Sequence, residues 1–294
     1  MTAGTDAEVL KKLEEWERKG ESTPKFLEFY QRLLRIQSRA AERIGIPKPA
    51  LNSKASHERI ENGQTLISFD ELDLDWSLLQ DIFTEVAAAF AEYPELFGKI
   101  PRSLKERRST FSREIVRAWF EGAKLPPTIA GDNIDKHLLE ATTIQATLRP
   151  WLNSQAKALV GLVNLERWRR RYCPICGGSP DFAFLDKERG ARWLLCSRCD
   201  TEWLFQRLEC PYCGTTNQHA LAYFVDDEGL YRLYVCEQCH TYIKAIDLRH
   251  TESEVLLRLE RVMTLDLDRQ GQEKGYQPGY SRASSPVIPQ SDNS

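Results

Sequence analysis

The four motifs Cys173-Pro-Ile-Cys176, Cys196-Ser-Arg-Cys199, Cys210-Pro-Tyr-Cys213 and Cys236-Glu-Gln-Cys239 contain all eight cysteines of this 294-residue chain. Two residues between paired cysteines allow both sulfurs to approach one ion from a single tight turn. The gaps between successive pairs are 19, 10 and 22 residues. The long gaps fit a β-hairpin within a site, and the short gap fits a linker. The spacing therefore predicts two tetrahedral four-sulfur sites, one from Cys173, Cys176, Cys196 and Cys199 and one from Cys210, Cys213, Cys236 and Cys239.

The cysteine region also has the pattern of an internal repeat. Cys173-Pro-Ile-Cys-Gly177 matches Cys210-Pro-Tyr-Cys-Gly214, which begins 37 residues later. Arg192 and Arg232 each lie four residues before the first cysteine of the second turn, and Thr201 and Thr241 lie five residues after it. Short apolar runs before those turns favour strands. We therefore expect two copies of one small β-hairpin metal module.

The turn chemistry leaves the metal open between iron and zinc. Proline after the first cysteine fixes φ, and Gly177 or Gly214 after the second permits a positive φ that directs backbone N–H groups toward the sulfurs. Rubredoxins and zinc ribbons share this turn, so up to two ions of either metal per chain are expected. Thioredoxin-like redox chemistry fits four motifs with hairpin spacing less well than metal binding does. A disulfide framework fits a reducing cytoplasm less well. A c-type haem at Cys236-Glu-Gln-Cys239-His240 would break the repeat. His240 is expected to occupy a turn position and not to bind metal.

The residues before the cysteine region have helical periodicity. Apolar residues from Phe26 to Ile44 form one stripe between Thr23-Pro24 and Gly45, and a second stripe extends from Leu72 to Phe90 before Pro94. The sequence therefore predicts an α+β chain. Its expected parts are a helical domain (residues 1–165), two tandem rubredoxin-like or zinc-ribbon modules (166–208 and 209–250), a short C-terminal helical segment (251–276) and a disordered tail (277–294).

Composition and charge limit the functional classes. With 41% hydrophobic residues the chain can form a core, and its net charge is −3. Residues 166–249 contain 12 Lys and Arg against 12 Asp and Glu, a charge balance that disfavours phosphate binding. The sequence has neither a signal-peptide pattern nor an apolar run long enough to span a membrane, so a soluble cytoplasmic protein is expected. It also lacks a Ser-His-Asp pattern and a phosphate-binding loop, which predicts a non-enzymatic protein without catalytic residues or an organic cofactor.

Several motifs resemble those of the formate dehydrogenase accessory protein (FdhE) family. The similar segments are Cys173-Pro-Ile-Cys-Gly-Gly-Ser-Pro180, Leu195-Cys-Ser-Arg-Cys-Asp-Thr-Glu-Trp203, Cys210-x-x-Cys213, Cys236-x-x-Cys239-His-Thr-Tyr-Ile-Lys244, Leu265-Asp-Leu-Asp268 and Glu273-Lys-Gly-Tyr276. The resemblance covers residues 148–276. The chain departs from the family at His240, where glycine is often found, and in its polar C-terminal tail.

The resemblance implies a cytoplasmic, chaperone-like assembly factor that binds the catalytic subunit of respiratory formate dehydrogenase. It also implies rubredoxin-like iron binding at the eight cysteines. Two other functional hypotheses remain: an iron electron carrier that acts on a client, and a zinc-ribbon nucleic-acid binder, which the charge disfavours. Membrane insertion is not expected, and self-association is possible from the sequence.

Overall fold

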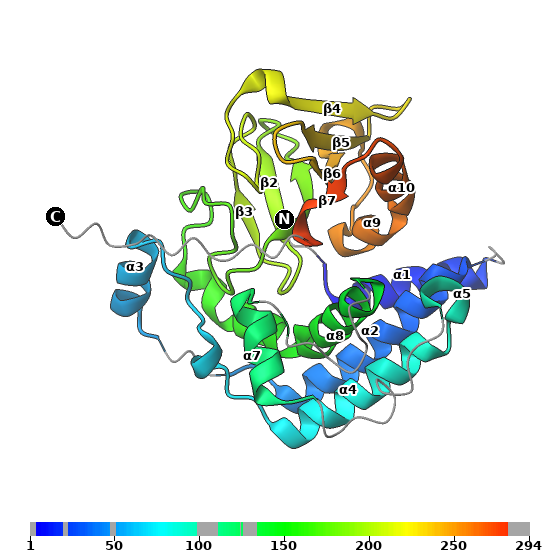
Figure 1. The fold of residues 1–294 in the computed structure, drawn as a ribbon, viewed down its shortest axis with the longest axis vertical. Coiled ribbons are helices and arrows are strands. Elements are labelled where there is room, and N and C mark those ends of the chain that lie inside the picture. Colours follow the sequence, from blue (N-terminus) through cyan, green and yellow to red (C-terminus); the bar gives the residue numbers. More distant parts are fainter. Residues whose placement is uncertain are drawn as a thin grey trace. The chain divides into compact units, whose positions relative to one another are not determined.

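The computed structural model describes residues 4–19, 23–47, 51–98, 111–123, 125 and 134–281 (Figure 1). The chain packs into two units. A helical unit comprises residues 4–48 and 69–155, and a sheet unit comprises residues 49–68 and 156–294, as far as they are described. These units confirm the predicted α+β class, with helices first and a sheet region later.

The helical unit contains α1 (Asp6–Arg18), α2 (Lys25–Ile44), α4 (Trp76–Ala91), α5 (Pro94–Phe97), α7 (Arg113–Glu121) and most of α8 (Ile134–Leu159). Its helices begin where side chains can accept free backbone N–H groups: Thr5 caps α1, Asp75 caps α4 and Ser112 caps α7. The predicted apolar stripes form the core between α2 and α4. Buried members include Leu27, Leu33, Leu34, Ile36, Leu79, Ile82, Phe83, Val86 and Phe90.

The sheet unit contains two three-stranded meanders. The first comprises β1 (Pro180–Leu185), β2 (Arg192–Cys196) and β3 (Glu202–Leu204), and the second comprises β4 (Leu221–Val225), β5 (Tyr231–Cys236) and β6 (Thr241–Asp247). Within each meander neighbouring strands are antiparallel. The Cys196–Cys199 turn connects β2 to β3 and the Cys236–Cys239 turn connects β5 to β6, while the other two cysteine turns precede β1 and β4. This arrangement confirms the two predicted hairpin modules.

The two modules are fused into one sheet, an arrangement that the sequence analysis did not predict. β1 pairs with β6 in parallel, with Phe182 opposite Lys244, and the strand order is β3-β2-β1-β6-β5-β4. Phe182, Phe184 and Leu195 of the first module share a buried cluster with Ile246 of the second. The pairing buries apolar side chains that neither module could cover alone.

Segments outside the expected modules complete the sheet unit. α3 (Ser53–Glu61) precedes a stretch whose Leu66 and Ile67 amides donate to the carbonyls of Pro174 and Ile175, at 3.0 and 2.9 Å. Residues 51–68 therefore pack with the cysteine region, whereas the expected limits assigned them to the helical domain. α9 (Leu257–Met263) and α10 (Leu265–Glu273) form the expected C-terminal helical segment beside β6 and β7 (Figure 1).

The expectation of a disordered tail from residue 277 is wrong at its start. β7 (Gln277–Pro278) pairs in parallel with β6, and a 3₁₀ turn follows at Gly279–Ser281. Tyr276 anchors this segment, because its ring is buried and its hydroxyl donates to Glu237. The rest of the expected tail, residues 282–294, lies outside the described residues.

Candidate metal centres

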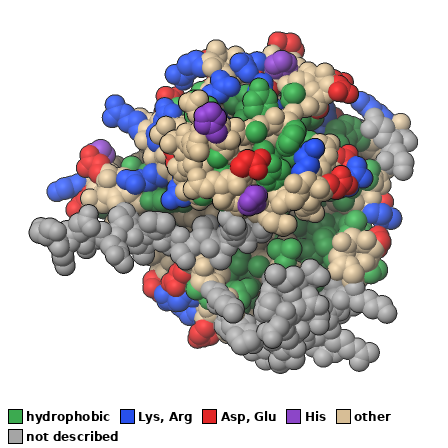
Figure 2. Space-filling view, turned by 45° about the horizontal axis from the view of Figure 1, so that its top comes forward, with side chains coloured by type: hydrophobic (Ala, Val, Ile, Leu, Met, Phe, Trp, Pro, Cys, Tyr) green, Lys and Arg blue, Asp and Glu red, His purple; other side chains and the backbone are tan. Residues whose placement is uncertain are grey.

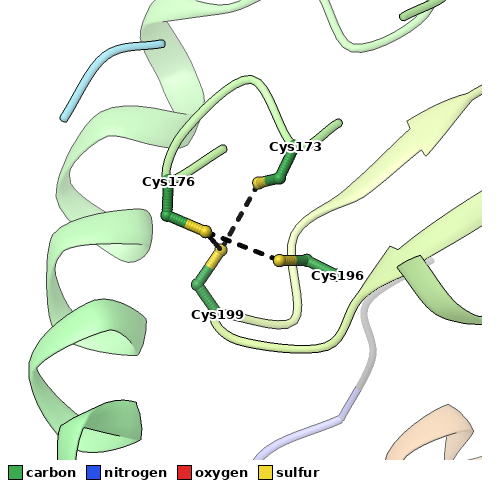
Figure 3. A group of neighbouring side chains, drawn as sticks. All are labelled: Cys173, Cys176, Cys196 and Cys199. Carbon is green, nitrogen blue, oxygen red and sulfur yellow. Dashed lines mark hydrogen bonds between the residues drawn. The ribbon is translucent and has the colours of Figure 1, made fainter. Parts of the chain in front are cut away.

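The first cysteine group lies where two turns meet at one end of the first meander (Figure 3). Cys173 and Cys176 precede β1, and Cys196 and Cys199 lie at the end of β2 and in the following turn. The Sγ–Sγ distances are 3.5 Å for Cys173–Cys199, 3.5 Å for Cys176–Cys196 and 3.4 Å for Cys176–Cys199. All four side chains are buried. The structure therefore brings together the four residues predicted for this site.

The second group repeats this arrangement with more exposure. Cys210–Cys239 and Cys213–Cys236 have Sγ–Sγ distances of 3.7 Å. Three of these cysteines are buried, but Cys213 is only half-buried. A cavity of about 30 Å³ adjoins this group and is lined partly by Cys210, Cys236 and Arg192. The second predicted set of four also converges, at a less enclosed position.

The sulfur spacing fits a tetrahedral metal ion and not a disulfide. A disulfide bond is about 2.05 Å long, whereas four sulfurs each about 2.3 Å from one ion form a tetrahedron with edges of about 3.8 Å. In each group the four sulfurs lie within 4.8 Å of one another. Both cysteine sets can therefore hold one ion of zinc or iron.

The backbone of each turn has the conformation that these sites require. The residue after the second cysteine has a positive φ in all four turns: 72° at Gly177, 55° at Asp200, 77° at Gly214 and 51° at His240. The Gly177 and Gly214 amides each donate to the carbonyl of the first cysteine at 3.0 Å. His240 therefore takes the turn position expected for it, and the second sulfur group consists of four cysteines without it.

Hydrogen-bond donors surround the sulfurs. The Arg198 and Tyr212 amides donate to Cys196 Sγ and Cys210 Sγ at 3.4 Å. The hydroxyls of Thr201 and Thr241 lie 3.1 and 2.9 Å from Cys199 Sγ and Cys239 Sγ. These donors disperse thiolate charge and orient the ligands. The repeated threonines of the sequence therefore have a common role in the two modules.

Burial makes simultaneous ionisation of the first group unfavourable without a cation. It raises the pKa of the Cys173 and Cys199 thiols, and hydrogen bonds with Cys176 and Cys196 raise both further. Hydrogen bonds from Cys173, Cys196 and Cys199 lower the pKa of Cys176. One thiolate is thus stabilised at the expense of its neighbours. A divalent ion would remove this conflict, because it attracts all four thiolates.

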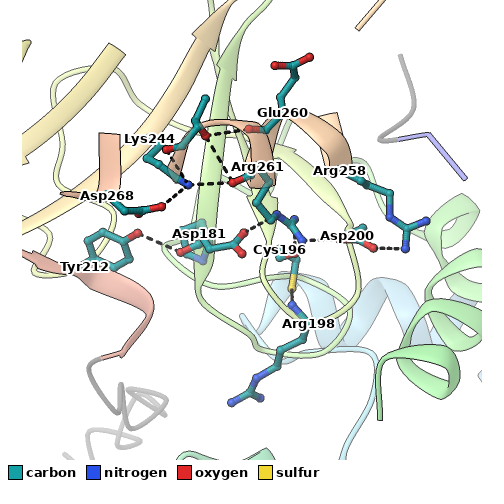
Figure 4. A network of polar contacts seen from close by, with 12 residues as sticks. Asp181, Cys196, Arg198, Asp200, Tyr212, Lys244, Arg258, Glu260, Arg261 and Asp268 are labelled. Carbon is teal, nitrogen blue, oxygen red and sulfur yellow. Dashed lines mark hydrogen bonds and ion pairs between the residues drawn. The ribbon is translucent and has the colours of Figure 1, made fainter. Parts of the chain in front are cut away.

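A buried ionic network connects α9 to the first metal centre (Figure 4). Asp200, which follows Cys199, forms an ion pair with Arg258 at 2.6 Å and accepts a hydrogen bond from Arg261 at 2.9 Å. Arg261 also donates to the Cys196 carbonyl at 3.1 Å and lies 3.2 Å from Asp181. Burial raises the pKa of Asp181 to about 6, against the opposing charge of Arg261. The network thus holds the side chain of Asp200, the residue whose backbone has a positive φ in the second turn.

The network extends to α10 through Lys244. Lys244 Nζ lies 2.6 Å from Asp268 and donates to the Arg261 carbonyl at 2.8 Å. These ion pairs were not predicted from the sequence, because the partners lie 24 to 80 residues apart and no local spacing connects them. Their only sequence signal was the family-like pair of segments ending at Lys244 and Asp268.

Comparison with known proteins relates the chain to one family. Residues 172–207, which include the first cysteine group, match the model "FdhE, central domain". A curated FdhE homolog from Aquifex aeolicus is 41% identical over 115 residues, covering 38% of this chain and 40% of that protein. FdhE from Escherichia coli O127:H6 is 27% identical over 140 residues, covering 47% of this chain and 45% of that protein. The alignments thus span less than half of these relatives.

The fold has a counterpart among solved structures. The crystal structure of the FdhE protein from Pseudomonas aeruginosa superposes with a TM-score of 0.56 at 23% identity, over 85% of each chain. This similarity extends the agreement in fold beyond the cysteine region. The matched residues are thus similar to FdhE proteins, and the crystal structure shares the fold of this chain.

Proposed function

We propose that this chain is a formate dehydrogenase accessory protein, a non-enzymatic cytoplasmic factor that binds the catalytic subunit during its maturation. The match of residues 172–207 to the FdhE central domain carries the proposal, because that segment contains a complete four-cysteine centre. Bound metal ions would stabilise the cysteine turns, and with them the surface of the sheet unit beside those turns. All eight cysteines belong to the two sulfur groups, which leaves none of them for nucleophilic catalysis.

The surface charge supports a protein partner over a nucleic acid. On the face seen in Figure 2, Lys and Arg side chains are interspersed with Asp and Glu and with exposed hydrophobic groups. Nucleic-acid binders need a continuous basic surface. Among the described residues, no helix combines the length and apolar composition that would cross a membrane.

A pull-down tests the proposal. The tagged chain is expressed in a formate-respiring bacterium, and bound proteins are identified by mass spectrometry. We expect enrichment of the formate dehydrogenase catalytic subunit relative to a Cys176→Ser/Cys213→Ser bait, in which both metal centres are incomplete. Recovery of RNA polymerase or ribosomal proteins in place of that subunit would overturn the proposal.

An iron electron carrier is the second candidate function. The half-buried Cys213 and the N–H···S contacts favour it, because partial exposure permits electron transfer and such contacts tune the potential of an iron–thiolate site. Voltammetry of the purified protein separates the two. Iron with a reversible potential would support the carrier, whereas redox-inert zinc in both centres would exclude it.

A further inference from the structure

β4 (Leu221–Val225) forms one end of the sheet, and among the described strands only β5 pairs with it. The amide of Asp226 donates to Tyr231, and the carbonyl of Ala220 accepts from Glu237, so residues 220 and 226 face β5. Antiparallel pairing alternates, and residues 222 and 224 therefore also face β5. The backbone groups of residues 221, 223 and 225 consequently point to the open edge.

The open edge is apolar and regular. Tyr223, Phe224 and Val225 are 52%, 39% and 53% exposed. Residues 221–225 include no charged side chain or proline, and their register with β5 has no bulge. Charged side chains, proline and bulges normally protect an edge strand from pairing with another chain, and β4 has none of them. β3, at the opposite end of the sheet, is largely buried, and its Leu204 amide donates to Leu165. Of the two ends of the described strand order, the exposed edge is therefore that of β4.

An acidic turn lies at one end of this edge. Asp226, Asp227 and Glu228 follow β4 directly, and the Asp226 side chain accepts from the Tyr231 amide. Asp227 and Glu228 are exposed and form no ion pair within the described part of the chain. A strand added to β4 would place one of its ends beside these two carboxylates. Lysine or arginine at that end would find complementary charge.

We propose that β4 binds an extended peptide by strand addition, and that this peptide has an apolar core with Lys or Arg at the end beside Asp227 and Glu228. A second copy of the chain fits less well. Two-fold antiparallel pairing of β4 would place each acidic turn beside residues 218–220 of the other copy, where His219 is the sole residue that can carry positive charge. The identification of this peptide as a segment of the formate dehydrogenase catalytic subunit rests on the proposed function.

Fluorescence anisotropy with a synthetic peptide tests the site on the full chain. The probe is a labelled ten-residue peptide of alternating Val and Thr with two lysines at one end. It is made in two versions, one with the lysines at the N-terminus and one with them at the C-terminus. We expect one of the two versions to bind. N-methylation of the alternate backbone amides that face β4 should abolish its binding. N-methylation of the other residues should preserve it, because only one edge of the peptide bonds to β4.

Matched variants test the charge. Asp227→Asn/Glu228→Gln should weaken binding by about threefold to tenfold, as expected for two exposed ion pairs. Glu58→Gln/Glu61→Gln, which changes charge equally on α3, should leave binding unchanged. Metal content equal to that of the unaltered chain establishes that both variants are folded.

Three results would overturn the proposal. They are absence of peptide binding, binding insensitive to N-methylation on either edge, and concentration-dependent dimerisation that Val225→Lys disrupts while the peptide fails to bind. Catalytic-subunit recovery without peptide binding would refute the strand site and leave the proposed function intact. Peptide binding without recovery of that subunit would refute the proposed function and leave the strand site intact.

Discussion

Thr201 and Thr241 occupy equivalent positions in the two modules, and each hydroxyl contacts a cysteine sulfur. Burial opposes ionisation of Cys239, but the Thr241 hydroxyl and the neighbouring thiols outweigh it and lower the pKa of this thiol. A threonine two residues after the last cysteine thus favours the thiolate that a metal requires. The repeat conserves a specific contact with the sulfur, in addition to the turn itself.

Replacing this hydroxyl tests its contribution. Thr241→Val keeps the shape of the side chain and removes the donor, so metal affinity should fall about tenfold, in the range typical of residues that support metal ligands. Competition with a chromophoric chelator measures the change. Thr251→Val is the control, because the Thr251 hydroxyl accepts from the Ser253 amide and lies away from both cysteine groups in the described part of the chain. Equal affinities for both variants would show that the Thr241 contact is incidental.

Glu202 introduces a pH dependence. Burial, together with the charge of Asp200, raises the pKa of Glu202 to about 7, and one carboxylate oxygen lacks a hydrogen-bond partner among the described residues. The folded state therefore holds a proton more tightly than the unfolded state, whose Glu titrates near pH 4.3. The contribution of Glu202 to the free energy of unfolding is therefore greatest below about pH 4 and falls as the pH rises to about 7.

Glu202→Gln should remove this dependence. We expect the variant to be more stable than the unaltered chain at pH 8, by roughly 2 to 3 kcal/mol, and nearly equal to it at pH 4. Urea denaturation at the two pH values measures the difference. A stability difference that is the same at both would contradict the raised pKa.

Among the elements, the parallel pairing of β1 and β6 marks the limit of sequence-based prediction. The hairpins were predictable because cysteine spacing, Gly177 and Gly214 define them locally. The fusion depends on contacts between residues about 60 positions apart, such as Phe182 opposite Lys244, and no local pattern encodes them. The docking of Leu66 and Ile67 against the first cysteine turn was unpredictable for the same reason. The two four-cysteine groups were therefore predictable, and the ionic network beside the first of them was not.

Lys244 couples β6 to α10 within this network. Burial lowers the pKa of Lys244, while the charge of Asp268 opposes the decrease. Lys244→Met would leave the Asp268 carboxylate without its cation, although the Tyr242 hydroxyl still donates to it at 2.8 Å. The expected loss of stability is about 3 kcal/mol, as for other broken buried pairs.

Chemical denaturation of Lys244→Met measures this loss. Arg269→Met on α10 is the control, because Arg269 forms an exposed ion pair with Asp266. The control should change stability little. Equal effects of the two substitutions would show that the Lys244–Asp268 pair does not stabilise the packing of α10.

For the whole molecule, the unequal burial of the two sulfur groups predicts unequal release of metal. All four cysteines of the first group are buried, whereas Cys213 of the second is half-buried and a small cavity adjoins that group. An excess of chromophoric chelator should remove one ion quickly and the other slowly. Cys213→Ser should eliminate the fast phase, and Cys176→Ser the slow one. A single phase in the unaltered chain would contradict this difference.

Elemental analysis of the purified protein tests the central claim, that the chain contains two independent four-cysteine metal centres. The account predicts two ions per chain, one ion in Cys176→Ser, one in Cys213→Ser and none in the double variant. A stoichiometry that neither substitution changes, or a single ion that either substitution removes, would contradict it.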